Sequence, residues 1–281
     1  MDSQEINKFI KENVNKIYDE MVKVRRTIHE NPELGDEEFE TSKLIRRFLT
    51  ENGIEFFEII NTGVVATIYN DKENMKNKTV ATRADIDALP ILEENEVEYK
   101  SKNIGKMHAC GHDAHTTIQL GVAKILAENK DKWNGTVRFF FQPAEETSGG
   151  SDRMIKAGAL EFEKEKDKKI DAFFALHMAP EIELGKIGIK YGKAHASSAR
   201  IHLTINGTSA HAALPHKGVD AILIGAKVME YLQSIVSRRI DPREESVITI
   251  GAFNGGFADN VVCDKVEMKG TARTMSEETR T

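Results

Sequence analysis

The segment MHACGHDAHTT, residues 107–117, concentrates side chains that can bind a metal ion. It contains three of the chain's nine histidines, one of its two cysteines and an aspartate. On a helix, Cys110 and His112 would point to different sides, but in a loop Gly111 allows both to turn toward one ion. A thiolate with an imidazole suits zinc or another borderline divalent cation. For each residue taken singly, the alternative is a free core thiol or an ordinary histidine.

Further acidic and imidazole side chains follow other apolar segments of the chain. Glu145 and Glu146 come after TVRFFFQ, and His177 comes directly after DAFFAL. Carboxylates beside cysteine and histidine favour a catalytic site with an open coordination position over a closed structural zinc site. Adjacent glutamates on a turn cannot easily serve one ion from the same side. One can therefore bind metal while the other acts as a base on water, the machinery of amide hydrolysis. Two solvated loop acids are the alternative for this pair alone.

The elements that must position these residues alternate between helix and strand. Apolar residues at three- and four-residue steps predict a long opening helix over residues 6–28, and a second helix is expected over residues 37–51. Strands are predicted at GVVATIYN, TVATRAD, TVRFFFQ and IDAFFALHM, with the last two buried. Helices are predicted at DAHTTIQLGVAKILAENK, which Asp113 can cap, and at SDRMIKAGAL.

This alternation predicts an α/β layer with a largely parallel sheet. Ligands of such sheets bind beyond the carboxyl ends of the strands. Asp85 and Asp87 follow one predicted strand, Glu145 and Glu146 follow another, and His177 follows a third. Separate segments thus deliver acidic and imidazole groups to one rim, which is the main physical reason to expect a metal site.

The pattern changes after about residue 186. The segments SSARIHLTING, SVITIGAFNGG and VVCDKVEMKGTART alternate as strands with one wet face, and a helix is expected over residues 219–236. This β-α-β-β order predicts a small α+β unit with an antiparallel sheet. We therefore expect two domains, residues 1–188 and residues 189–281.

Length, charge and cysteine content restrict the class of protein. The 281 residues, 40% hydrophobic and 30% charged, are typical of a soluble globular protein with a proper core. The net charge of −6 argues against nucleic acid or an anionic membrane as partner. No apolar run could span a bilayer, and the acidic N-terminal segment is unlike a signal peptide. Cys110 and Cys263 make no disulfide framework, so we expect a reducing, cytoplasmic setting.

Several segments together resemble the M20 metallopeptidase family, specifically its amidohydrolase branch. That branch contains N-acyl-L-amino acid amidohydrolases, hippurate hydrolases, N-acetyldiaminopimelate deacetylases and auxin-conjugate hydrolases. The matching segments are RRTIHENPELGDEEFETS, TRADIDALPI, MHACGHDAHTT, GTVRFFFQPAEETSGGSDRMIKAGAL, LHMAP, GTSAHAALPHKGVDAI and GTART. The resemblance implies a zinc-exopeptidase-like domain, whose mixed, largely parallel sheet is flanked by helices. It also implies an inserted, ferredoxin-like lid domain that mediates homodimerisation.

The resemblance further implies a two-metal hydrolytic site. Four residues match ligands of two divalent ions, which could be zinc, manganese, cobalt or nickel: Cys110, His112, Glu146 and His177. Glu145 matches the base that activates water, and Asp87 matches an aspartate that orients and tunes the site. Asp85 stands where other branches have a histidine ligand, so its role stays open.

In the lid domain, His211 matches a histidine that reaches the partner subunit's site and steadies the oxyanion. Asn260 and Arg273 match residues that bind the substrate, and a guanidinium can grip its carboxylate with two hydrogen bonds. The implied activity is metal-dependent removal of an acyl group from an N-acyl amino acid, or cleavage of a small peptide-like amide.

Family members continue well beyond Thr281, so the resemblance implies a C-terminally incomplete chain that lacks the closing lid elements and a final metal-binding histidine. The alternative function is therefore a truncated, catalytically impaired metal-binding or regulatory dimer. A hydrolase with Cys110 as nucleophile is disfavoured, because flanking acids would raise the pKa of its thiol.

Overall fold

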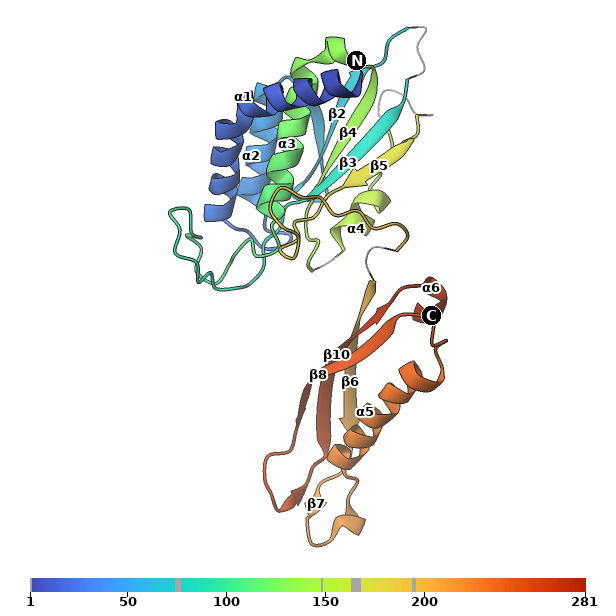
Figure 1. Ribbon diagram of the computed structural model, residues 1–281. Coiled ribbons are helices and arrows are strands. Elements are labelled where there is room, and N and C mark those ends of the chain that lie inside the picture. The colour runs from blue at the N-terminus through green and yellow to red at the C-terminus, as the bar shows by residue number, and fades with distance from the viewer. Residues whose placement is uncertain (1, 74–76, 148, 163–167, 194–195) are drawn as a thin grey trace. The chain divides into compact units, whose positions relative to one another are not determined.

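The computed structural model describes residues 2–73, 77–147, 149–162, 168–193 and 196–281. The chain divides into two compact units, Met1–Glu181 and Ile182–Thr281 (Figure 1). Among the described residues, no helix combines the length and the apolar character that crossing a bilayer requires.

The first unit is built on a five-stranded sheet in the order β1-β2-β4-β3-β5. The strands are β1 (Glu55–Ile59), β2 (Gly63–Asn70), β3 (Thr79–Asp85), β4 (Gly135–Gln142) and β5 (Ala172–Ala175). β3 runs parallel to β4 and β5, whereas the β1/β2 and β2/β4 pairs are antiparallel. The sheet is therefore mixed rather than largely parallel. The reason lies partly in the three-residue connection 60–62, which can join β1 to β2 only as a hairpin.

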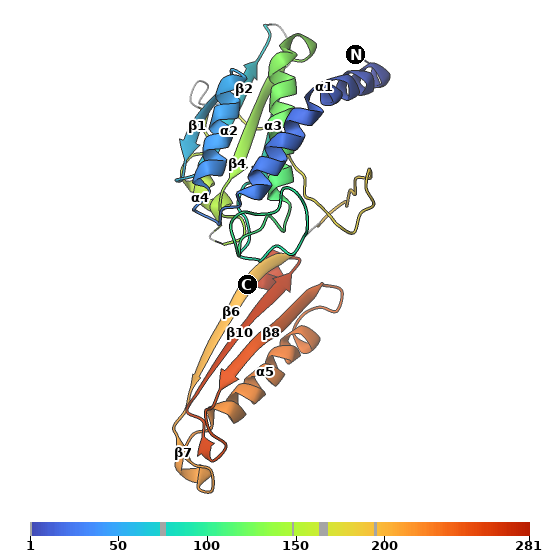
Figure 2. The ribbon, with the colours of Figure 1, turned by 90° about the vertical axis from the view of Figure 1, so that its left-hand side faces the viewer.

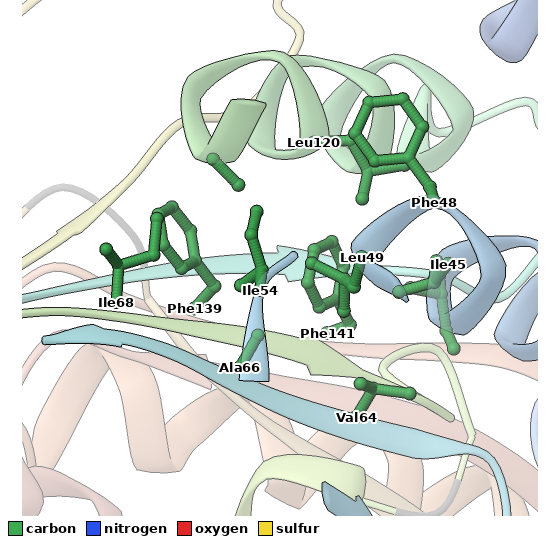
Figure 3. Packing of buried hydrophobic residues seen from close by; sticks show 12 residues of the cluster. Ile45, Phe48, Leu49, Ile54, Val64, Ala66, Ile68, Leu120, Phe139 and Phe141 are labelled. Carbon is green, nitrogen blue, oxygen red and sulfur yellow. The ribbon is translucent and has the colours of Figure 1, made fainter. Parts of the chain in front are cut away.

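Helices α2 (Phe39–Glu51) and α3 (His112–Glu128) pack on one face of this sheet, and α1 (Ser3–Glu30) packs against α3 (Figure 2). Alternate strand residues point to that face, as the period of a β-strand requires. They form one apolar cluster with the helices (Figure 3), which includes Ile45, Leu49, Val64, Ala66, Ile68, Leu120, Phe139 and Phe141.

The intervening strand residues point to the opposite face. There Val65 and Phe140 pack with Met154 of the short helix α4 (Gly150–Lys156). β4 is thus covered on both sides, as its apolar run predicts. The turn that follows it carries Glu145 and Glu146.

The prediction of a buried strand at IDAFFALHM is wrong in one respect. The segment does form β5, but Phe173 and Phe174 are 51% and 60% exposed. Within the described residues, β5 pairs only with β3 and forms an edge of the sheet. An apolar sequence therefore does not by itself report whether a strand is covered.

The second unit contains an antiparallel sheet in the order β6-β10-β8. Its strands are β6 (Ser197–Asn206), β8 (Ser246–Gly255) and β10 (Lys265–Thr274), and β7 (Ala210–His211) pairs separately with β9 (Val261–Val262). The helix α5 (Ala221–Arg238) packs on one face of the sheet over Val266 and Met268. Short helical turns lie at Lys130–Lys132, Pro215–Lys217 and α6 (Glu277–Arg280). This is the antiparallel α+β arrangement that the alternating segments predict.

Candidate metal centre

Three donor atoms meet beyond the carboxyl ends of the parallel strands. Cys110 Sγ lies 3.4 Å from His177 Nε2, and His112 offers a ring nitrogen within 4.8 Å of both. Two ligands that sit 2.0–2.3 Å from a tetrahedral ion are themselves about 3.3–3.8 Å apart. The spacing and the softness of this donor set therefore fit a divalent cation such as zinc.

The His112 ring is oriented for such an ion. Its Nδ1 donates to the main-chain oxygen of Asp87 at 2.8 Å, which leaves Nε2 as a lone-pair donor. Nε2 makes no hydrogen bond to any described residue, although Asp85 Oδ2 and Glu146 Oε1 lie 3.5 Å and 3.8 Å away. The side chain is 1% exposed, and a buried polar atom without a partner is unfavourable unless something binds it.

Two carboxylates from the turn after β4 lie close to His112. His112, Glu145 and Glu146 present ligand atoms within 4.8 Å of one another. The Glu146 N–H donates to Asp87 Oδ2 at 3.0 Å, and Asp87 Oδ1 lies 3.2 Å from His112 Nδ1. Asp87 thus contacts two candidate ligands at once.

The loop geometry follows from one glycine. α3 begins at His112, and Gly111 before it has a left-handed backbone with φ of 88°. That conformation lets Cys110 and His112 face the same space, as the sequence predicts.

Asp113, however, does not cap this helix, which has no side-chain cap. Its buried Oδ2 lies 2.7 Å from Arg25 Nε and 2.8 Å from His29 Nδ1. His29 also contacts Glu93, with 3.0 Å between Nε2 and Oε1. This network was not predicted from the sequence, although the i, i+4 spacing of Arg25 and His29 on α1 indicates that their side chains share a face.

The pKa values of the acidic groups in the site shift in different directions. Burial and the neighbouring Glu146 carboxylate raise the pKa of Glu145, although its side chain reaches solvent. Burial opposes ionisation of Asp85, but the His115 hydrogen bond and nearby cationic groups lower its pKa to about 2. Burial and Glu146 raise the pKa of the Cys110 thiol to about 12, so an arriving cation must displace a proton there.

His115 and His108, the other histidines of residues 107–117, are not in the group that Cys110, His112 and His177 form. His115 uses both ring nitrogens, one toward Asp85 and one toward the Met178 N–H. His108 is buried, its ring nitrogens make no hydrogen bond to a described residue, and burial lowers its pKa to about 4.

The candidate residues of the second unit fall into two places. His211 on β7 is exposed, and its neighbour Ala212 donates its N–H to the Asn260 carbonyl at 2.9 Å. Arg273 lies on β10, exposed and paired in register with Ser198 and Val247. It is eight positions from Lys265 at the start of that strand, or roughly 26 Å. The fold thus brings His211 and Asn260 together and holds Arg273 apart from them.

Comparisons with known proteins agree on one family. A family model described as Peptidase family M20/M25/M40 matches residues 81–275. The chain is 42% identical over 269 residues to an N-acetyl-L-cysteine deacetylase of Bacillus subtilis, covering 95% of this chain and 62% of that protein. It is 44% identical over 263 residues to an IAA-amino acid hydrolase of Arabidopsis thaliana, covering 93% of this chain and 57% of that protein.

A solved structure is similar as well. It is a dinuclear metal-binding peptidase of the M20 family from Bacillus subtilis, 36% identical, with a TM-score of 0.74 over 95% of this chain and 67% of that one. The chain spans less than two thirds of the length of the two enzymes compared by sequence.

Proposed function

The chain belongs to Peptidase family M20/M25/M40, and from that membership we propose that the protein is a metal-dependent amidohydrolase that removes the acyl group from an N-acyl amino acid. The observation that carries this proposal is the convergence of Cys110, His112, His177 and the Glu145–Glu146 pair at one rim. The two relatives compared by sequence are, by name, a deacetylase of an N-acetyl amino acid and a hydrolase of an amino acid conjugate. Both names favour this function over a catalytically impaired metal-binding dimer.

We propose that Cys110, His112, Glu146 and His177 hold two divalent ions. The similar M20 peptidase is described as dinuclear, and zinc, manganese, cobalt and nickel all suit a mixed sulfur, nitrogen and oxygen donor set. When bound, such ions act as Lewis acids on an amide carbonyl and lower the pKa of water.

Glu145 supplies the proton transfer in this proposal. A base works best when its pKa approaches the operating pH, and the Glu145 pKa is shifted in that direction by burial and by Glu146. Its carboxylate takes the proton of the attacking water and then delivers it to the leaving amine. Asp87 keeps His112 and Glu146 in place through its side-chain and main-chain oxygens.

We propose that residues 189–281 form a lid domain that also makes a homodimer. Arg273 would bind the substrate carboxylate, because a guanidinium offers two parallel donors to it. His211 would reach the partner subunit's site and steady the oxyanion there, and Asn260 would bind substrate.

Because Cys110 must stay reduced to bind metal, we also propose a reducing, cytoplasmic setting. The function is tested with a panel of N-acetyl amino acids and hippurate, assayed after chelation and after addition of Mn²⁺, Co²⁺ or Zn²⁺. We expect hydrolysis that is lost on chelation and restored by a metal. Hydrolysis of none of these amides with any metal would contradict the proposal.

A further inference from the structure

The backbone of Met178 contacts two imidazole rings, one through its N–H and one through its carbonyl oxygen. Its N–H donates to His115 Nε2 at 2.8 Å, and its carbonyl oxygen accepts from His177 Nδ1 at 2.7 Å. A backbone N–H can only donate and a carbonyl can only accept, so these contacts fix both tautomers. His115 Nε2 carries no proton, and His177 Nδ1 carries one. In the neutral His177 ring, the Nε2 that faces Cys110 Sγ is therefore the unprotonated nitrogen.

His115 is held in turn by a buried carboxylate. Its Nδ1 donates to Asp85 Oδ1 at 2.6 Å, and Asp85 Oδ2 lies 2.7 Å from Arg83 Nη1. Asp85 and His115 are 0% and 2% exposed. Although ligand atoms of Asp85, His112 and His115 lie close enough to hold an ion, both nitrogens of His115 are already engaged. The geometry therefore suits His115 to holding a neighbour rather than to binding metal.

The segment that carries His177 needs such an anchor. β5 ends at Ala175, and the side chains of Leu176, His177 and Met178 are all exposed. Besides the His115 hydrogen bond, Met178 packs against Gly111. A Cβ on that glycine would lie 2.8 Å from Met178 Cγ. The segment is thus fastened to both the start of α3 and the loop that carries Cys110.

We propose that Asp85 and His115 are positioning residues, which set the orientation and tautomer of His177 through the backbone of Met178. The inference rests on the proposed metal centre, but not on hydrolysis, because it concerns metal affinity. It gives Asp85 a role as the partner that fixes the His115 ring. Support of this kind around a metal-binding histidine contributes about 10–100-fold to metal affinity.

Two substitutions of His115 distinguish its contact with Met178 from its contact with Asp85. In His115→Gln, the amide oxygen can replace Nε2 and accept from the Met178 N–H. In His115→Asn, the shorter amide reaches only the place of Nδ1, so it keeps Asp85 and loses Met178. The dissociation constant of Co²⁺ is measured by competition with a chelator, together with the thiolate-to-cobalt absorption of Cys110. We expect about 10–100-fold weaker binding in the Asn variant and most of the parent's affinity in the Gln variant.

A double-mutant cycle with His177→Ala decides between positioning and direct ligation. If His115 acts through His177, His115→Asn causes no further loss of Co²⁺ affinity once His177 is alanine. An equal loss in both backgrounds, as a direct ligand would give, overturns the proposal. Should the Asn variant fail to fold, judged by the thermal unfolding of the metal-free protein, the same cycle is run with Asp85→Asn and the same two outcomes.

Failure of the proposed hydrolytic function has a different signature. A protein that binds Co²⁺ and shows the predicted coupling but cleaves no N-acyl amino acid would contradict the function and support the positioning role. Absence of Co²⁺ binding in the parent protein would overturn both.

Discussion

The His112 ring donates from Nδ1 to the main-chain oxygen of Asp87 at 2.8 Å. His177 is held in the same manner by the Met178 carbonyl at 2.7 Å. In the neutral form of each ring, the proton on Nδ1 leaves Nε2 as the lone-pair donor, and this is the arrangement that a metal-binding histidine needs. One buried histidine, His112, and one exposed histidine, His177, thus share this feature beside Cys110.

The two cysteines provide a matched test of the donor set. Cys110→Ser should weaken Zn²⁺ affinity by at least about 100-fold, because the change removes a ligand rather than an outer-shell partner. Cys263→Ser is the control, since Cys263 is buried in the small core of the second unit. Chelator competition measures both, and equal Zn²⁺ affinities in the two variants would contradict the assignment of Cys110.

Substitutions of Glu145 and Glu146 distinguish the proposed base from a proposed metal ligand. Glu145→Gln should lower kcat by about 10²–10⁴-fold, because the amide cannot accept the proton of water. Its metal content should stay at the parent level, whereas Glu146→Gln should lower metal content as well. Steady-state hydrolysis and elemental analysis of the same preparations give the two readouts. A Glu145→Gln enzyme as active as the parent would exclude this residue as the base.

The buried contacts of His29 with Asp113 and Glu93 predict that the stability of the protein depends on pH. The Asp113 hydrogen bond, with help from Glu93, raises the pKa of His29 above its ordinary value despite burial and the Arg25 charge. A raised folded-state pKa gives stability that is complete below the unfolded value of about 6.5 and is lost as the pH rises through the folded value. Asp113, whose pKa is lowered by His29 against the effect of burial, loses its share instead in acid.

Chemical unfolding of the parent and of His29→Gln at several pH values measures this effect. The difference in unfolding free energy between the two proteins should be largest near pH 6 and should shrink toward pH 9. A difference that is constant over that interval would show that His29 is not protonated in the folded protein.

The different burial of Phe141 and Phe174 predicts different contributions to the free energy of unfolding. Phe141 is 0% exposed in the cluster between the sheet and its helices, and Phe174 is 60% exposed on β5. Phe141→Ala should lower the free energy of unfolding by about 3–5 kcal/mol, whereas Phe174→Ala should change it by less than about 1 kcal/mol. Denaturant titration measures both, and comparable losses would mean that β5 is covered in solution.

Much of this architecture is predictable from the sequence, because hydrophobic periodicity sets the elements and parallel strands end at a common rim. Those two rules place Asp85, Glu146 and His177 together without knowledge of any contact. These two rules do not predict features that depend on the position of a strand within the sheet. The exposure of β5 depends on its neighbours in the sheet, and the short strand β1 lies at the other edge, where its pattern is weak.

Local sequence patterns likewise do not predict which side chains distant in sequence contact each other. Asp113 looks like a helix cap, but it contacts His29, 84 residues away. The role of His115 depends on the main-chain N–H of Met178, and a backbone group leaves no trace in the amino-acid pattern.

The central claim is that Cys110, His112, Glu146 and His177 converge on divalent metal, and Co²⁺ titration of the chelator-treated protein tests it most directly. We predict saturable, tight binding with intense near-ultraviolet absorption from thiolate bound to cobalt, which disappears in Cys110→Ser. A protein that binds no Co²⁺ at any concentration short of precipitation, or that binds it without thiolate absorption, would contradict the account.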